Sequence, residues 1–308
     1  MFYTLISRFQ VLVLVSVGIS VPFSWSFEST TLNSHLFAVE ESAQNPDHLE
    51  ILAAESPRVL YLAAENSEAL ATAKVAIQMG SEVALEFDPN SFLISKLTLI
   101  NQKPQDPKAP VKKWGPSSYA PSVLNNFIQL QNLFDSVDPY RDVDLSDHCF
   151  SRAHYWARTL EVDHQVKSMK VFVLFTPQYR NEHNFNWWYH VAPYVSVQTS
   201  GETQRIVIDP SYEQAPKEIR DWVFHFAAKA DTCRIATSLA QYHAEAAQGG
   251  CVVITASMYH YTPQDLRPEN PKDYWRCEDL RDVKDNLRSP APYSDWKSYG
   301  SFLPDYCL

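Results

Sequence analysis

Three residues of the sequence, Cys149, His190 and Asp209, have the types and the chain order that a thiol-dependent hydrolase uses. A cysteine thiolate is the nucleophile in such enzymes, a histidine takes and returns the proton, and a carboxylate orients the histidine. Cys149 also stands apart, because the other four of the five cysteines lie after residue 230. The residue types alone therefore indicate nucleophilic catalysis, provided that the fold brings them together.

His190 and Asp209 are expected to lie on one face of a β-hairpin. Two apolar stretches flank a Thr-Ser-Gly-Glu turn, at residues 187–197 and 204–208. A loop centred between Ser200 and Gly201 places His190 opposite Ser211. Because side chains alternate along a strand, Asp209 then projects from the same face as His190, as a diagonal neighbour. An odd-length loop or a bulge would place them on opposite faces.

Cys149 is expected at the start of a helix, with Asp147 as its N-cap. The apolar face of this helix comprises Cys149, Ala153, Trp156, Ala157 and Leu160. A helix N-terminus carries partial positive charge and unpaired N–H groups, which favour a thiolate and can stabilise an oxyanion. The residues alone leave open a second interpretation, in which Cys149 is a buried structural residue or a disulfide partner.

The four C-terminal cysteines predict two disulfides and one remaining thiol. Four cysteines allow three pairings; we expect Cys233 with Cys251 and Cys277 with Cys307. The polar, proline-rich region after residue 261 has little periodicity, so the second disulfide would hold it in place.

The N-terminus has the layout of a secretory signal. Arg8 precedes an apolar run over residues 11–21, and small residues around Trp25 suggest cleavage after Ser26. The run is short for a membrane span, although an uncleaved anchor remains the alternative. We expect a signal peptide over 1–26 and a secreted product, either extracellular or periplasmic.

The remainder divides into two units. Residues 27–116 are expected to form a pro-segment, folded over about 57–100 as β-α-β-β with Gly80 ending the helix. Residues 101–121 carry five prolines and the dibasic pair Lys112-Lys113, which is typical of an exposed linker. Residues 117–308 are expected to form an α+β catalytic domain. In this domain the spacing of Val123, Phe127 and Phe134 predicts one apolar face of a helix. The apolar run Val171–Phe175 predicts a buried core strand.

Three segments together resemble the bacterial protein-glutaminases, which are secreted deamidases of protein-bound glutamine. These segments are His148–His154, Trp187–Val191 and Arg205–Ser211. The resemblance implies a transglutaminase- or papain-like catalytic domain in which Cys149, His190 and Asp209 form the triad. It also implies a pro-segment that covers the active site as an intramolecular inhibitor.

The same resemblance suggests roles for neighbouring side chains. Trp187, Trp188 and Tyr189 are candidate substrate-binding residues, although alternation on a strand means that at least one belongs to the core. Arg152 and His154 match the motif. We expect them to form an ion pair on the helix surface, or to contact the catalytic residues from behind, rather than to take part in catalysis. The substrates would be proteins or peptides that bear glutamine.

Other classes of function are less well supported. Transglutaminase or cysteine-protease activity would use the same residues with another acceptor or bond, and a secreted non-catalytic binding protein would leave Cys149 structural. The net charge of −10 argues against nucleic acid and anionic membrane as partners. The histidines outside the triad show no ligand spacing, so we expect no metal and no cofactor. We expect a monomer.

Overall fold

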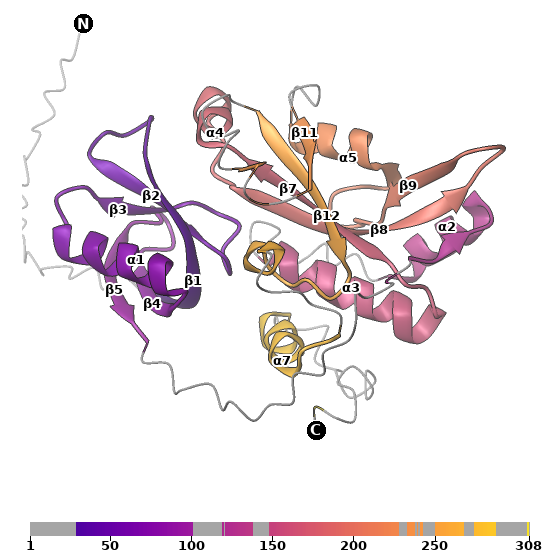
Figure 1. Cartoon of the computed structure of the whole chain (residues 1–308), viewed down its shortest axis with the longest axis horizontal. Coiled ribbons are helices and arrows are strands. Elements are labelled where there is room, and N and C mark those ends of the chain that lie inside the picture. Colours follow the sequence, from indigo (N-terminus) through magenta and orange to yellow (C-terminus); the bar gives the residue numbers. More distant parts are fainter. Residues whose placement is uncertain are drawn as a thin grey trace, which may run out of the picture.

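The computed structural model describes residues 29–100, 121–137, 148–227, 233–237, 250–267 and 274–287, together with Tyr119, Leu239, Gln241, Tyr242 and Cys307. The signal peptide, almost all of the expected linker and the proposed N-cap Asp147 lie outside these residues. Two β-sheets dominate the described part, one in the N-terminal third and one in the remainder (Figure 1).

The N-terminal unit is a five-stranded antiparallel sheet in the order β3-β2-β1-β4-β5. Its strands are β1 (Thr30–Glu41), β2 (His48–Ala53), β3 (Leu60–Ala63), β4 (Glu82–Phe87) and β5 (Ile94–Leu99). Helix α1 (Ser67–Met79) packs on this sheet and ends at Gly80, whose φ of 63° is the left-handed conformation that glycine adopts readily. The expected β3-α1-β4-β5 order is confirmed.

The expected folded range of 57–100 is too narrow, because β1 and β2 precede it. β1 lies in the centre of the sheet and pairs with both β2 and β4. The N-terminal half of β1 is mostly polar, so the sequence lacks the apolar pattern that would predict a strand there.

The larger unit is built on a seven-stranded sheet whose main path runs β10-β9-β8-β7-β12-β11, with the short β6 beside β8. The strands are β6 (Val123–Leu124), β7 (Met169–Phe175), β8 (Tyr189–Gln198), β9 (Thr203–Val207), β10 (Lys217–Glu218), β11 (Cys233–Ala236) and β12 (Cys251–Ser257). β7 is the core strand expected over 171–175 and lies between β8 and β12. The mixed helix and sheet content confirms an α+β fold.

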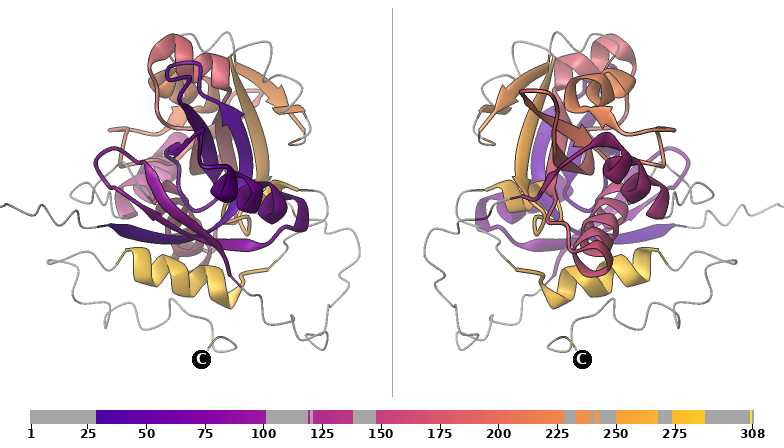
Figure 2. Two further views of the ribbon diagram at one scale, coloured as in Figure 1. Left: turned by 90° about the vertical axis from the view of Figure 1, so that its left-hand side faces the viewer. Right: turned by 90° about the vertical axis from the view of Figure 1, so that its right-hand side faces the viewer.

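In the part of the chain that the structure describes, five α-helices accompany this sheet: α2 (Phe127–Ser136), α3 (Cys149–His164), α4 (Pro177–His183), α5 (Ile219–Phe226) and α7 (Cys277–Asn286). α3 packs against β7 and β8, and α7 packs against α3 (Figure 2). The expected stripe on α2 is partly wrong. Val123 belongs to β6, and Phe127 is half exposed because the buried face consists of Leu130, Leu133 and Phe134.

Two disulfides are present, Cys233–Cys251 and Cys277–Cys307, and Cys149 is a free, buried cysteine. The expected pairing is therefore confirmed. The first bond joins β11 to β12, and the second holds the start of α7 to the C-terminal end of the chain. Among the described residues, no helix is both long and apolar enough to span a bilayer.

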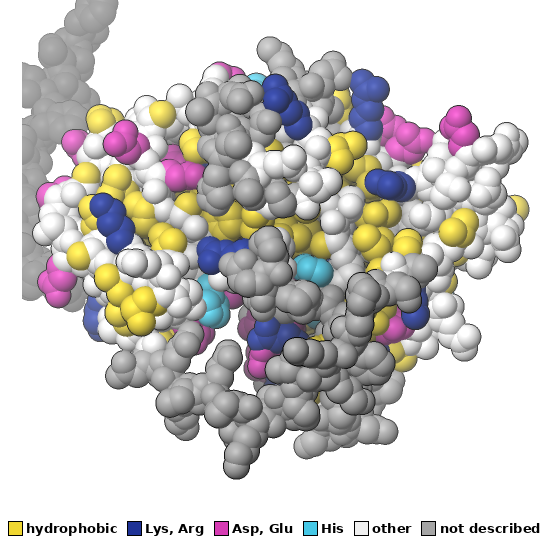
Figure 3. All heavy atoms as spheres, in the orientation of Figure 1, with side chains coloured by type: hydrophobic (Ala, Val, Ile, Leu, Met, Phe, Trp, Pro, Cys, Tyr) yellow, Lys and Arg dark blue, Asp and Glu magenta, His cyan; other side chains and the backbone are white. Residues whose placement is uncertain are grey.

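The two units share a hydrophobic core. Phe37, Leu52 and Val59 from the N-terminal unit belong to the same buried cluster as Phe150 and Trp188 of the larger unit. Figure 3 shows hydrophobic side chains gathered in the middle of this face, between the two units. The N-terminal unit is therefore packed onto the larger one over a continuous apolar surface.

Candidate active site

Cys149 is the first residue of α3 and is 1% exposed. The N-cap is His148 rather than Asp147, and its backbone is left-handed with a φ of 62°. A left-handed histidine is uncommon, and such conformations gather at functional sites. Burial raises the pKa of the Cys149 thiol to about 12, although the Arg152 charge and hydrogen bonds from the Val191 and Phe150 amides oppose this rise. The thiol is therefore protonated while the site is covered.

Arg152 and His154 are buried, at 1% and 0% exposure, so the expected helix-surface ion pair is wrong. α3 is covered on several sides, which leaves no solvent face at its first turns. His154 Nδ1 lies 2.7 Å from Nζ of the buried Lys170, and its ring contacts Tyr261. His154 therefore has a structural role, whereas the positive charge of Arg152 acts on the Cys149 thiol.

His190 lies in β8, and the β8–β9 hairpin has the register expected from the sequence, with Tyr194 opposite Val207. His190 Nε2 is 2.9 Å from Oδ2 of Asp209, and both side chains are 1% exposed. The other ring nitrogen, Nδ1, is buried and has no hydrogen-bond partner among the described residues. With Nε2 bound to the carboxylate, Nδ1 is the atom that is free to accept a proton.

Four aromatic rings surround the imidazole: Trp187, Tyr212, Trp222 and Phe226, with centroids 4.4 to 5.5 Å from that of His190. Two of these rings come from α5, an element whose role the sequence did not indicate. Burial lowers the pKa of His190, and the Asp209 hydrogen bond opposes this effect. The histidine is therefore neutral and able to act as a base.

Trp222 is a further residue of this site that sequence reasoning missed. Its indole Nε1 donates to Oδ2 of Asp209 at 2.9 Å, the same oxygen that His190 contacts. The sequence pattern predicts that a tryptophan on an amphipathic helix is a buried core residue. The hydrogen bond to Asp209 is therefore visible only in the folded structure.

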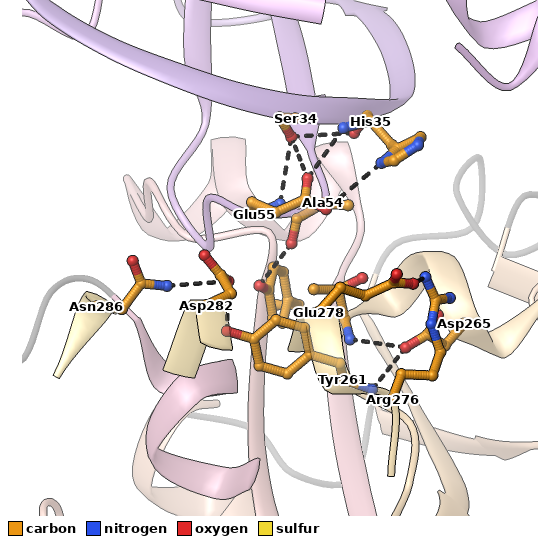
Figure 4. Close-up of polar contacts among 12 residues, drawn as sticks. Ser34, His35, Ala54, Glu55, Tyr261, Asp265, Arg276, Glu278, Asp282 and Asn286 are labelled. Atoms are coloured by element: carbon orange, nitrogen blue, oxygen red, sulfur yellow. Dashed lines mark hydrogen bonds and ion pairs between the residues drawn. The ribbon is translucent and has the colours of Figure 1, made fainter. Parts of the chain in front are cut away.

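A polar network ties α3 to the disulfide-held α7. Ser151 Oγ is 2.7 Å from the Tyr261 hydroxyl and accepts a hydrogen bond from Asn286 at 3.0 Å. The Tyr261 hydroxyl donates to Asp282 (Figure 4). Through these contacts the Cys277–Cys307 disulfide supports the helix that carries Cys149.

Residues 53–59 of the N-terminal unit lie across the start of β8. The Trp188 amide donates to the Pro57 carbonyl at 2.8 Å, and the Val59 amide donates to the Asn186 carbonyl at 2.8 Å. Arg58 and Trp187 form an antiparallel β-bridge. This segment therefore extends the sheet immediately before His190.

The expected substrate-binding residues are covered by the same segment. The Trp188 indole donates to the Ser56 carbonyl at 2.6 Å, and the Tyr189 hydroxyl donates to the Ala54 carbonyl at 2.8 Å. Trp188 and Tyr189 are 0% exposed, whereas Trp187 is partly exposed beside His190. Glu55 turns away from the larger unit and binds Ser34 of β1 (Figure 4).

Within the described ranges, no three His, Cys, Asp or Glu side chains are grouped so as to hold a metal ion. His190 and Asp209 are in contact, and the Cys149 thiol lies against the amide of Val191, the residue after His190. A thiol, an imidazole and a carboxylate are the groups that acyl transfer through a covalent thioester requires. Such chemistry uses groups that the chain itself supplies.

The chain is similar to known proteins over the range that holds these residues. Residues 126–226 match the family model described as Glutaminase, and this range includes Cys149, His190 and Asp209. No curated protein sequence matches the chain significantly.

Among solved structures, the crystal structure of pro-protein-glutaminase is similar, with a TM-score of 0.55 and 17% sequence identity, over 86% of this chain and 96% of that one. A mutant of pro-protein-glutaminase gives a TM-score of 0.54 and 18% identity, over 86% and 97% of the two chains. The shared fold includes the N-terminal unit as well as the larger one.

Proposed function

We propose that this protein, whose residues 126–226 match the glutaminase family, is the pro-form of a cysteine-dependent protein-glutamine deamidase. It hydrolyses the side-chain amide of protein-bound glutamine to glutamate and ammonia. The observation that carries the proposal is the match of the glutaminase family to the range that holds Cys149, His190 and Asp209. The hydrogen bond of 2.9 Å between His190 and Asp209 supports their assignment as base and orienting carboxylate.

In the first half of the reaction, His190 accepts the Cys149 proton at Nδ1, and the thiolate attacks the γ-carboxamide carbon of glutamine. Asp209 holds Nε2 and stabilises the imidazolium that forms. The helix N-terminus at Cys149, including its backbone N–H, favours the negative charge that develops on the amide oxygen. His190 then protonates the departing nitrogen, so that ammonia leaves and a thioester remains.

In the second half, water takes the place of ammonia. His190 removes a proton from this water as it attacks the thioester carbonyl, and the proton returns to the Cys149 sulfur as the C–S bond breaks. The products are glutamate in the substrate chain and the regenerated thiol. The aromatic rings around His190 keep bulk water from the ion pair.

The N-terminal unit, residues 30–99, acts in this proposal as a pro-segment. It covers Trp188 and Tyr189, which become the glutamine-binding surface once it leaves, together with the exposed face of Trp187. The expected cleavage region is 101–121. A secreted destination, directed by a signal peptide at 1–26, fits the two disulfides, which persist in oxidising compartments. The mature enzyme acts as a monomer.

The decisive experiment is to fold the full chain, cut it within residues 101–121, digest the pro-segment, and add a blocked Gln-Gly dipeptide. Ammonia release without peptide cleavage or isopeptide product supports deamidation. Isopeptide formation with an added amine would indicate a transglutaminase, and peptide cleavage a protease. A Cys149→Ser chain treated in the same way is the control, and we expect it to be inactive but folded because a hydroxyl has a far higher pKa than a thiol. Activity equal to wild type in that control would remove Cys149 as the nucleophile.

A further inference from the structure

Arg180, on α4, is a buried cation whose carboxylate partners both come from the pro-segment. Its side chain is 2% exposed, and Nη2 lies 2.7 Å from Glu40 and 2.6 Å from Glu50. These are the two ion pairs that Arg180 makes within the described part of the chain. Nη1 donates to the Phe175 carbonyl at 2.6 Å, which fixes the guanidinium at the end of β7.

The two carboxylates share one cation. Glu40 and Glu50 are directly opposite each other on β1 and β2. Like charges at such a position repel and destabilise a sheet. Burial raises the pKa of Glu40, and Arg180 only partly offsets this effect. The two carboxylates therefore outnumber the one positive charge that they contact. Their position opposite each other does not stabilise the sheet of the pro-segment, so their contact with Arg180 is the favourable interaction that they make.

Removal of the pro-segment leaves Arg180 without either carboxylate. A buried charge that loses its partner is costly unless water or another anion replaces it. The guanidinium remains anchored by the Phe175 carbonyl, which belongs to the larger unit. The mature enzyme consequently presents a fixed cation on the surface that the pro-segment had covered.

Arg180 is next to the surface on which we place the glutamine. The Phe175 amide donates to the Trp188 carbonyl at 2.8 Å, so the residue that anchors Arg180 is paired with a residue two places before His190. The pro-segment reaches both features in one stretch, because β2 contacts Arg180 through Glu50 and continues into Ala53, whose carbonyl accepts a hydrogen bond from Trp188. An extended chain can therefore contact the cation and the edge of β8 at once.

We propose that Arg180 is a substrate subsite of the mature enzyme that binds the carboxylate of an aspartate or glutamate lying N-terminal to the target glutamine. The proposal deepens the proposed deamidase function and depends on it. Arg180 offers a charge-assisted hydrogen bond to the incoming carboxylate, as it does to Glu50. The specificity is thus for acidic peptide segments.

The chain order of the pro-segment indicates on which side of the glutamine the acidic residue lies. After the pro-segment leaves, the edge at residues 186–188 has open backbone groups, and an extended substrate adds there as the pro-segment does. Glu50 precedes by three to five residues the positions 53–55, two of which contact Trp188 and Tyr189. We place the glutamine where residues 53–55 lie, against the Trp188 and Tyr189 side chains, so the acidic residue is expected three to five residues before it.

The experiment uses the full chain, folded, cut in the linker and freed of pro-segment by digestion. Blocked peptides with one glutamine carry glutamate or, as a matched neutral control, methionine at three, four or five residues before it. We expect kcat/KM to be about tenfold higher for the best glutamate peptide than for its neutral counterpart, and this ratio to fall as salt is added.

The same peptides are then compared on Arg180→Gln and on Arg205→Gln, which removes an exposed arginine of β9. The ratio should collapse to about one in Arg180→Gln and persist in Arg205→Gln, since the ratio cancels any general loss of activity. Equal rates for glutamate and neutral peptides in the wild-type enzyme would overturn the subsite, even if Arg180→Gln fails to fold. Absence of ammonia from every peptide would instead overturn the proposed deamidase function.

Discussion

Trp222 donates its indole N–H to Oδ2 of Asp209, at 2.9 Å, and so shares that oxygen with His190. The second oxygen, Oδ1, is buried and has no hydrogen-bond partner in the described ranges. One carboxylate oxygen thus receives two donors while the other receives none. Trp222 therefore fixes the rotation of the carboxylate and withdraws negative charge from the atom that faces the imidazole.

Trp222→Phe should lower kcat by about 10- to 100-fold, because a hydrogen bond to a charged group contributes about 1.5–3 kcal/mol. With this donor removed, Oδ2 holds the His190 proton more strongly, so the acidic limb of the pH–rate profile should move to higher pH. The control is Trp275→Phe, which removes an indole hydrogen bond to Glu161 on the far part of α3. A profile shift of equal size in both variants would assign Trp222 a structural role only.

Asp209→Asn should lower kcat by about two to four orders of magnitude, because an amide favours the wrong histidine tautomer. Both donors bind the same oxygen, Oδ2, so an asparagine NH₂ at that position would break both hydrogen bonds, and at the Oδ1 position it would be buried without an acceptor. Reactivity of Cys149 toward a small alkylating reagent should persist, since the thiol itself is unchanged. An unaltered pH–rate profile would show that Asp209 does not orient His190.

Alkylation of Cys149 should depend on whether the pro-segment is present. In the intact chain burial raises the pKa of Cys149 to about 12, and only the thiolate reacts. The rate should therefore be very low at neutral pH and rise about tenfold per pH unit toward that value. After cleavage and digestion we expect the thiol to become exposed, while the charge of Arg152 and the base His190 remain. Rapid reaction near neutrality is then expected, and equal rates in both forms would contradict a covered nucleophile.

The hairpin register could be predicted because turn chemistry and strand alternation agree. The Thr199–Glu202 turn fixes which residues are opposite, and the period of two then assigns Asp209 and His190 to one face. The pairing of the cysteines, by contrast, was one of three that the sequence left open, and the structure selects Cys233–Cys251 and Cys277–Cys307. The hairpin register is a local property of the chain, whereas the disulfide pairing depends on the tertiary fold.

The remaining parts depend on contacts between distant residues. Arg180 looks like a surface arginine on a short helix, and only its contact with β1 and β2 shows that it is buried. Trp222 and Phe226 of α5 reach His190 through tertiary packing. Strands β1 and β2 divide their buried side chains between the core of the N-terminal unit, which holds Leu36 and Ile51, and the core shared with the larger unit, which holds Phe37. Their sequences alone therefore give a weak signal.

The contact between Phe37 and Trp188 allows a test of whether the pro-segment inhibits the enzyme in the uncut chain. Phe37 of β1 stacks on the Trp188 ring at 4.9 Å and also contacts Tyr242, so one pro-segment side chain is packed into the larger unit. A tethered inhibitor needs little intrinsic affinity, because a flexible linker gives an effective concentration of about millimolar.

The intact chain should release almost no ammonia from the Gln-Gly substrate. The chain nicked within residues 101–121 should gain activity on dilution, because the pro-segment is then lost to the solution. After nicking, the Phe37→Ala protein should need less dilution than wild type to become active. Without the stacked ring the pro-segment binds more weakly, so it dissociates at a higher protein concentration. The matched control is Val75→Ala on the exposed side of α1, away from this contact. Full activity in the uncut wild-type chain would refute inhibition, because every contact of residues 53–59 with Trp188 and Tyr189 is present in that state.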